Sequence, residues 1–138
     1  MRRLTTAVLA ALLLVVGCSG GDRSASTAAT TSLAEQTRTV GDVEVKALPT
    51  QLDPSGAAFA ITLDTHADSL TTDLAATTTL DVNATRWPTK GWSGDPPSGH
   101  HRNGTLRFTP AGPANGTATL TLAGLAEPVV FTWTIGGS

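Results

Sequence analysis

All the histidines of the chain lie in two short stretches that also carry aspartates. His66 follows Asp64 in "LDTHAD", and the adjacent His100 and His101 follow Asp95 in "GWSGDPPSGHHRNG". Imidazole nitrogens and carboxylate oxygens together suit Zn(II) and Cu(II). The sequence therefore predicts a metal site with all three histidines as ligands. One of the aspartates would be a fourth ligand or a hydrogen-bond partner of a ligating imidazole.

Composition narrows the choice of metal. The one methionine is Met1 and the one cysteine is Cys18, so both lie near the N-terminus. Cu(I) prefers thiolate and thioether ligands, and the rest of the chain offers it none. An interpretation without metal stays open, because adjacent residues of an extended strand point to opposite sides. Unless the chain bends after Gly99, the His-His pair cannot share one ion, and the histidines are then structural or solvent-exposed.

The same loop also has the composition of an elaborate turn. Gly94 and Asp95 would open the turn, residues 96–97 are prolines that hold an extended segment, and Trp92 would cover one end of the domain. A rigid loop that carries an aromatic residue is equally typical of protein recognition. The alternative hypothesis is therefore a protein-interaction or scaffolding module with a structural His-His loop. It requires Trp92 or Trp87 to be exposed.

Other classes of function find little support in the sequence. It contains neither a GxSxG nucleophile motif nor a glycine-rich phosphate-binding loop. The formal net charge is −2, and neither a basic patch nor a nucleic-acid-binding motif occurs. We therefore expect the protein to be neither an enzyme nor a nucleic-acid-binding protein.

Short strands are the elements that must position these residues. Apolar and polar residues alternate with a period of two, which is typical of half-buried strands. The alternating runs are "GDVEVKAL", "AAFAITLDTH", "TTLDVNA", "TLRFT", "TATLTLAGL" and "EPVVFTWTI". Turn sequences such as "DPSG" and "PAGPANG" separate them. We predict an all-β fold, an antiparallel immunoglobulin-like β-sandwich of about six or seven strands over residues 40–138, with a helical turn or short edge strand in residues 67–76.

The N-terminus predicts where this domain is located. Two arginines precede an apolar run over residues 7–16, which is shorter than the roughly 20 residues that span a bilayer, so residues 1–17 indicate a cleaved export signal. The sequence "VVGC" resembles the lipobox of bacterial lipoproteins, which implies that Cys18 carries acyl chains such as palmitate. Residues 18–39 are small and polar and predict a flexible tether. We expect an exported protein that its lipid anchors to the extracytoplasmic side of a bacterial membrane.

A second resemblance covers the domain itself. "ITLDTHADSL" and "WSGDPPSGHHRNGTLRFT" together resemble an uncharacterised family of extracytoplasmic bacterial and archaeal domains. Its members share a strand that ends in Asp-Thr-His and a Trp-x-Gly-Asp-Pro-Pro-x-Gly-His-His loop before the next strand. The resemblance implies a β-sandwich and draws attention to this loop, but it implies no reaction. The sequence thus predicts a lipoprotein with a non-catalytic binding domain, whose partner is a metal ion or another envelope protein.

Overall fold

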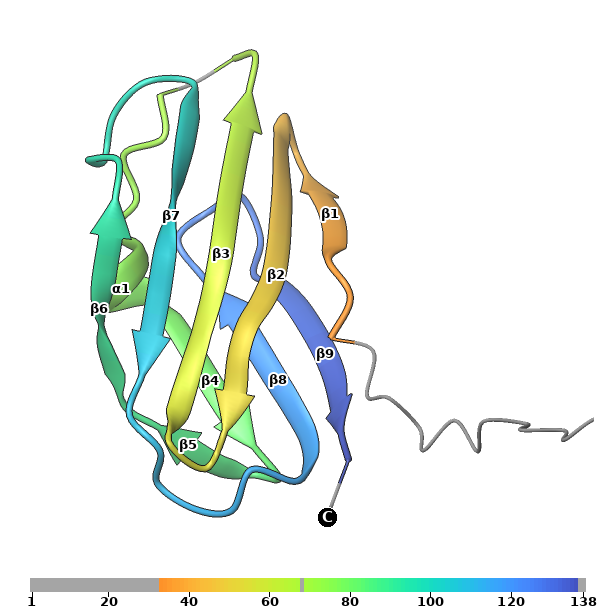
Figure 1. Cartoon of the computed structure of the whole chain (residues 1–138). Coiled ribbons are helices and arrows are strands. Elements are labelled where there is room, and N and C mark those ends of the chain that lie inside the picture. The colour runs from red at the N-terminus through yellow and green to blue at the C-terminus, as the bar shows by residue number, and fades with distance from the viewer. Residues whose placement is uncertain (1–32, 68, 137–138) are drawn as a thin grey trace, which may run out of the picture.

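The computed structural model describes residues 33–67 and 69–136, which form two antiparallel β-sheets packed face to face (Figure 1). One sheet has the strand order β1-β2-β3-β7-β6 and the other β5-β4-β8-β9. The elements are β1 Gln36–Val40, β2 Val43–Asp53, β3 Gly56–Thr65, α1 Leu74–Thr77, β4 Thr78–Val82, β5 Thr85–Trp87, β6 Thr89–Gly94, β7 His101–Phe108, β8 Gly116–Leu122 and β9 Val129–Ile135. The predicted antiparallel β-sandwich is therefore confirmed.

The described residues contain more strands than the sequence predicted. The additional strands are β1, β5 and β6, with the sequences QTRTV, TRW and TKGWSG. Each of them lies at an edge of its sheet. These three strands bury few side chains, so they carry few apolar residues and no clear alternation, whereas the remaining edge strand, β9, alternates regularly.

The ordered domain begins earlier than the predicted boundary at residue 40. The predicted signal peptide, Cys18 and the predicted tether up to residue 32 lie outside the described residues, but residues 36–39 belong to β1. Two side-chain hydrogen bonds hold this segment to β9. Nε2 of Gln36 donates to the Thr132 carbonyl over 2.7 Å, and Nε1 of Trp133 donates to the Ala34 carbonyl over 2.8 Å.

Alternating side chains from both sheets fill the space between them. Phe59, Ile61 and Leu63 of β3 are at most 1% exposed, and the Phe59 ring lies 5.3 Å from the ring of Trp133 in the opposite sheet. Burial stabilises the fold by about 1.5–3 kcal/mol for each such side chain. The buried core residues lie between residues 40 and 135. The core that the described residues form therefore lies entirely after Cys18, and we expect residues 19–138 to fold on their own.

A single turn of helix connects the two sheets. The predicted helical turn lies at α1, at the end of the segment predicted to hold it. The Asp73 carboxylate caps its N-terminus and accepts hydrogen bonds from the backbone N–H groups of Ala75 and Ala76 over 3.0 and 3.2 Å. No helix within residues 33–67 and 69–136 is long and apolar enough to cross a membrane.

Candidate functional site

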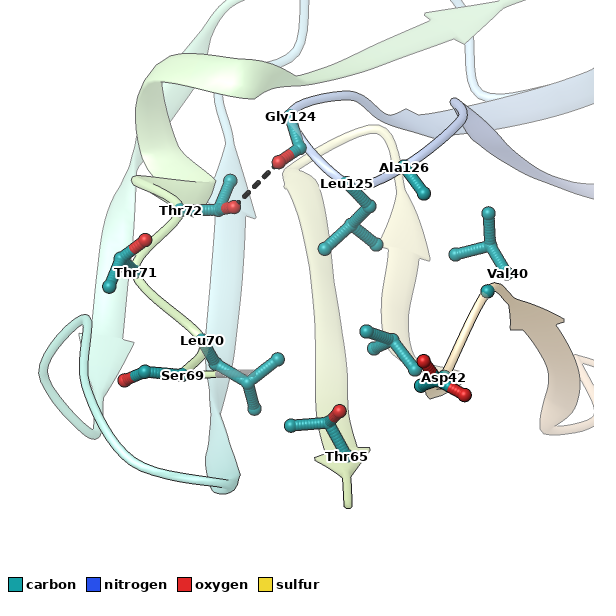
Figure 2. A pocket seen from close by; sticks show the side chains of 12 residues that line it. Val40, Asp42, Thr65, Ser69, Leu70, Thr71, Thr72, Gly124, Leu125 and Ala126 are labelled. Carbon is teal, nitrogen blue, oxygen red and sulfur yellow. Dashed lines mark hydrogen bonds between the residues drawn. The ribbon is translucent and has the colours of Figure 1, made fainter. Parts of the chain in front are cut away.

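A cavity of about 260 Å³ lies at one end of the sandwich, where three connecting segments meet. They are the β1–β2 turn, the irregular segment of residues 69–72, and the β8–β9 loop of residues 124–126. Figure 2 shows the side chains of Val40, Leu70 and Leu125 converging on this space from the three segments. The cavity thus has apolar walls that come from distant parts of the sequence.

Polar groups lie among these apolar walls. The hydroxyl-bearing residues Thr65, Ser69 and Thr72 line the cavity, and Asp42 contributes a carboxylate beside Val40 (Figure 2). Thr72 Oγ1 donates to the Gly124 carbonyl over 2.8 Å, which ties the irregular segment to the β8–β9 loop. An apolar space with a few fixed polar groups is the usual form of a small-molecule site.

The loop that the sequence singled out braces one wall of this cavity. The Gly99 carbonyl accepts a hydrogen bond from Leu70 N over 2.8 Å, and Gly99 N donates to Ser69 Oγ over 3.1 Å. The His100 carbonyl accepts from Thr65 N over 2.9 Å. Gly99 has a φ of +74°, a conformation that favours glycine. The loop therefore acts here through its backbone, and the His100 side chain is exposed.

Arg102 connects the same loop to the same wall from inside the domain. It is 1% exposed, although it lies near the start of β7, directly after the two histidines. Its Nη1 donates to the carbonyls of Thr72 and Leu70 over 2.7 and 3.4 Å, and its Nη2 donates to the Asp95 carbonyl over 3.4 Å. One buried side chain thus positions both the cavity wall and the start of the loop.

The charge of Arg102 has no carboxylate hydrogen-bond partner among the described residues. Burial lowers the pKa of Arg102 from its ordinary value, and the negative charges of Asp95 and Asp73 oppose that shift. An arginine stays charged even so, because its pKa begins far above neutral. The guanidinium also lies over the Trp92 ring, 5.4 Å from its centroid. Its Nε has no hydrogen-bond partner in the described structure.

Trp92 and Asp95 have structural contacts within the loop. Trp92 Nε1 donates to the Asp95 carbonyl over 2.9 Å, and the Asp95 carboxylate accepts from Asn103 N over 2.8 Å. Trp92 is half-buried over Gly104, where an added Cβ would lie 2.4 Å from the indole ring. Trp87 is fully buried. The protein-interaction hypothesis requires one of these two rings to be exposed as an anchor. Trp87 is therefore excluded as that anchor, and Trp92 exposes only part of its ring.

His101 and Asp64 form a hydrogen-bonded network on the outer face of the five-stranded sheet. The residues pair directly across β3 and β7, and His101 Nδ1 contacts the Asp64 carboxylate. The other ring nitrogen, Nε2, faces the side-chain amide of Asn103, whose Oδ1 accepts from Thr62 Oγ1 over 2.7 Å. Both ring nitrogens of His101 are therefore already engaged.

His66 lies apart from this network, at the exposed end of β3. It lines a groove of about 430 Å³ together with Asp42, Glu44 and Asp64. Within residues 33–67 and 69–136, no group of three or more His, Cys, Asp or Glu residues is arranged to hold a metal ion. The three-histidine site therefore stays a prediction from the sequence, as does the choice between Zn(II) and Cu(II).

The groove and the cavity meet at the β1–β2 turn. Gly41 and Asp42 line both of them. Glu44 in the groove pairs with Lys46 over 3.0 Å, whereas the Asp42 carboxylate has no ion pair or hydrogen bond among the described residues. Sequence reasoning missed Asp42 and the cavity, because Val40, Leu70 and Leu125 show no common spacing. Leu70 between polar neighbours in a segment without a regular period was the one available signal.

Comparisons with known proteins add little to this description. No family model and no curated protein matches the chain. Among solved structures, the chain is similar to the secreted protein MPT63 of Mycobacterium tuberculosis, with 17% sequence identity and a TM-score of 0.44 over 74% of this chain and 92% of the other. A similarity of this size carries no functional argument, so the site must be interpreted from its own geometry.

Proposed function

We propose that the protein is a membrane-anchored extracytoplasmic lipoprotein with a non-catalytic binding domain, and that its ligand binds in the cavity at the end of the sandwich. The observation that supports this site is the bracing of its wall. Backbone groups of Gly99 and the buried side chain of Arg102 both hold residues 69–72 in place. A wall fixed before the ligand arrives lowers the entropy cost of binding.

The position of β1 is compatible with an anchor that precedes it. The described chain begins beside β9, and β1 runs from there towards the cavity end (Figure 1). Five residues of extended chain cover roughly 15 Å. The cavity therefore lies away from the point where the tether joins the domain, and it would remain accessible on a membrane surface.

A non-catalytic role agrees with the surroundings of the Asp64–His101 pair. In hydrolytic triads the second imidazole nitrogen faces a nucleophile. Here Nε2 of His101 faces the Asn103 amide, which is not a nucleophile for acyl transfer. The alternative proposal, a module that binds an envelope protein, would use the same cavity end as its contact surface.

Lipidation is tested by labelling the full chain in bacterial cells with radioactive palmitate. We expect Cys18→Ala to abolish incorporation of the label and Ser19→Ala to leave it unchanged. Label that persists in the Cys18→Ala protein would contradict the anchor.

The cavity is tested with neutral probes on ¹⁵N-labelled protein of residues 19–138. We expect millimolar phenol or cyclohexanol to shift the amide resonances of residues 69–72 and 124–126. Ala126→Trp should fill the cavity and remove these shifts, whereas Ala111→Trp in an exposed loop should not. An unchanged response in the Ala126→Trp variant would show that the probes bind elsewhere.

A further inference from the structure

We propose that the natural ligand is a small amphipathic cation, with an apolar body in the cavity and an amino group that pairs with Asp42. This inference rests on the proposed function of the cavity and specifies the chemistry of its ligand. It follows from three properties of the site, namely its apolar walls, its volume and the sign of the charge at its edge.

The apolar part of the ligand is set by the cavity walls. Val40 and Leu70 are at most 9% exposed, and half-buried Leu125 covers the space from the β8–β9 loop. Leu125 is packed against the core on one side, so the cavity continues the apolar interior outwards. A ligand with an apolar part therefore gains contacts with these walls that a purely polar ligand does not gain.

The volume excludes a large ligand. Small-molecule sites usually enclose about 300–1,000 Å³. The cavity encloses about 260 Å³, and its hydrogen-bonded wall limits expansion. A short hydrocarbon chain or a single small ring fits this space, whereas a lipid with two acyl chains does not.

The residues that line both the cavity and the groove determine which charge on the ligand is favoured. Asp42 lines both spaces and has no partner among the described residues. Asp64 adds a second carboxylate along the groove, and no lysine or arginine of the described chain lines either space. The nearby Lys46 ammonium is paired with Glu44. A cation therefore gains a carboxylate partner at the cavity edge, and an anion meets repulsion.

Three probes with the same six-carbon chain separate these contributions. We propose titration of ¹⁵N-labelled protein of residues 19–138 with hexylammonium, hexanol and hexanoate at low salt. All should shift the cavity resonances, with hexylammonium binding about fivefold more tightly than hexanol and hexanoate more weakly still. The preference should fall at 1 M salt, because exposed ion pairs are screened.

The matched variants are Asp42→Asn and Asp53→Asn. Asparagine suits the β1–β2 turn, so the first variant should fold while losing the fivefold preference for hexylammonium. Asp53 is the last residue of β2. The β2–β3 turn that follows it lies at the other end of the domain (Figure 1), so replacing Asp53 should make the same change in net charge without affecting the preference.

The possible failures are distinguishable. Equal affinity of all three probes at the cavity would overturn the cationic ligand and leave the cavity function standing. A preference for hexylammonium that survives Asp42→Asn would overturn the role of this carboxylate. Cavity resonances that respond to none of the probes would overturn both this inference and the proposed site.

Discussion

Two polar regions lie side by side at the same end of the molecule, and they differ in how completely their groups are satisfied. In the network on the outer face, Thr62, Asp64, His101 and Asn103 all have side-chain partners. At the cavity edge, the Asp42 carboxylate has none among the described residues. Of the residues that the sequence singled out, Asp64 and His101 are engaged with each other, whereas the free Asp42 carboxylate lies in an ordinary turn. The two regions therefore differ in which carboxylate can pair with a ligand without first breaking a contact within the protein, and that carboxylate is the exposed Asp42.

The largest expected effect comes from replacing the side chain that supports the cavity from within. Arg102→Met should lower the free energy of unfolding by about 3 kcal/mol, because the buried Leu70 carbonyl and the partly buried Thr72 carbonyl lose a charged donor. Urea denaturation measures the change. Arg107→Met, at an exposed position of the same strand, should change it by less than about 0.5 kcal/mol. Equal effects of the two variants would show that Arg102 does not brace the cavity.

A smaller effect is expected where the loop backbone supports the wall. Gly99→Ala should cost about 1 kcal/mol, because alanine strains a backbone with a φ of +74°. An added Cβ there has no heavy atom within 4 Å, so a steric clash does not contribute. The amides of residues 69–72 should also exchange faster with deuterium. If these amides exchanged at an unchanged rate although the stability fell, the loop would not support the cavity wall.

The outer-face network should contribute less still. The His101 side chain is 58% exposed, so His101→Ala should lower the free energy of unfolding by at most about 1 kcal/mol. Binding of phenol in the cavity should be unchanged, because the loop contacts the cavity wall through backbone groups. If His101→Ala abolished phenol binding, the outer-face network would be coupled to the cavity, which would contradict this prediction.

Metal titration tests the three-histidine metal site predicted from the sequence. Among these experiments it should give the smallest effect. To ligate Zn(II) or Cu(II), His101 must release Asp64 or Asn103, so we expect any binding to be weak. Calorimetric titration of residues 19–138 measures it, with a variant in which all three histidines are alanine as the control. Micromolar binding that His66→Ala or His100→Ala abolishes would establish the predicted site.

The fold was largely predictable because alternation reports burial directly. On β9, the inward residues Val129, Phe131, Trp133 and Ile135 are buried and the residues between them are exposed, as the period of two requires. β1 shows no such alternation, because it buries few side chains. Local patterns therefore predict the strands that bury one whole face, and they miss β1, β5 and β6, which bury few side chains.

The candidate site was not predictable in the same way. The loop of residues 91–104 was recognised, but its contacts run from backbone atoms to a segment about 30 residues earlier in the chain, Ser69 and Leu70. Contacts made by backbone atoms do not constrain the residue type, except at Gly99, so the sequence does not reveal them. Arg102 was overlooked because a charged residue beside two histidines gives no sign of being buried.

The short strand β1 has a consequence for the solubility of the protein. β9 is an uncharged edge strand with an exposed Val130, and such edges pair readily with other chains. Gln36 donates to the Thr132 carbonyl of this strand, and the Arg38 guanidinium lies over its Phe131 ring. A chain shortened to begin at residue 40 would keep its core but leave this edge uncovered. Gln36 and Arg38 therefore help keep neighbouring copies of the protein from joining edge to edge.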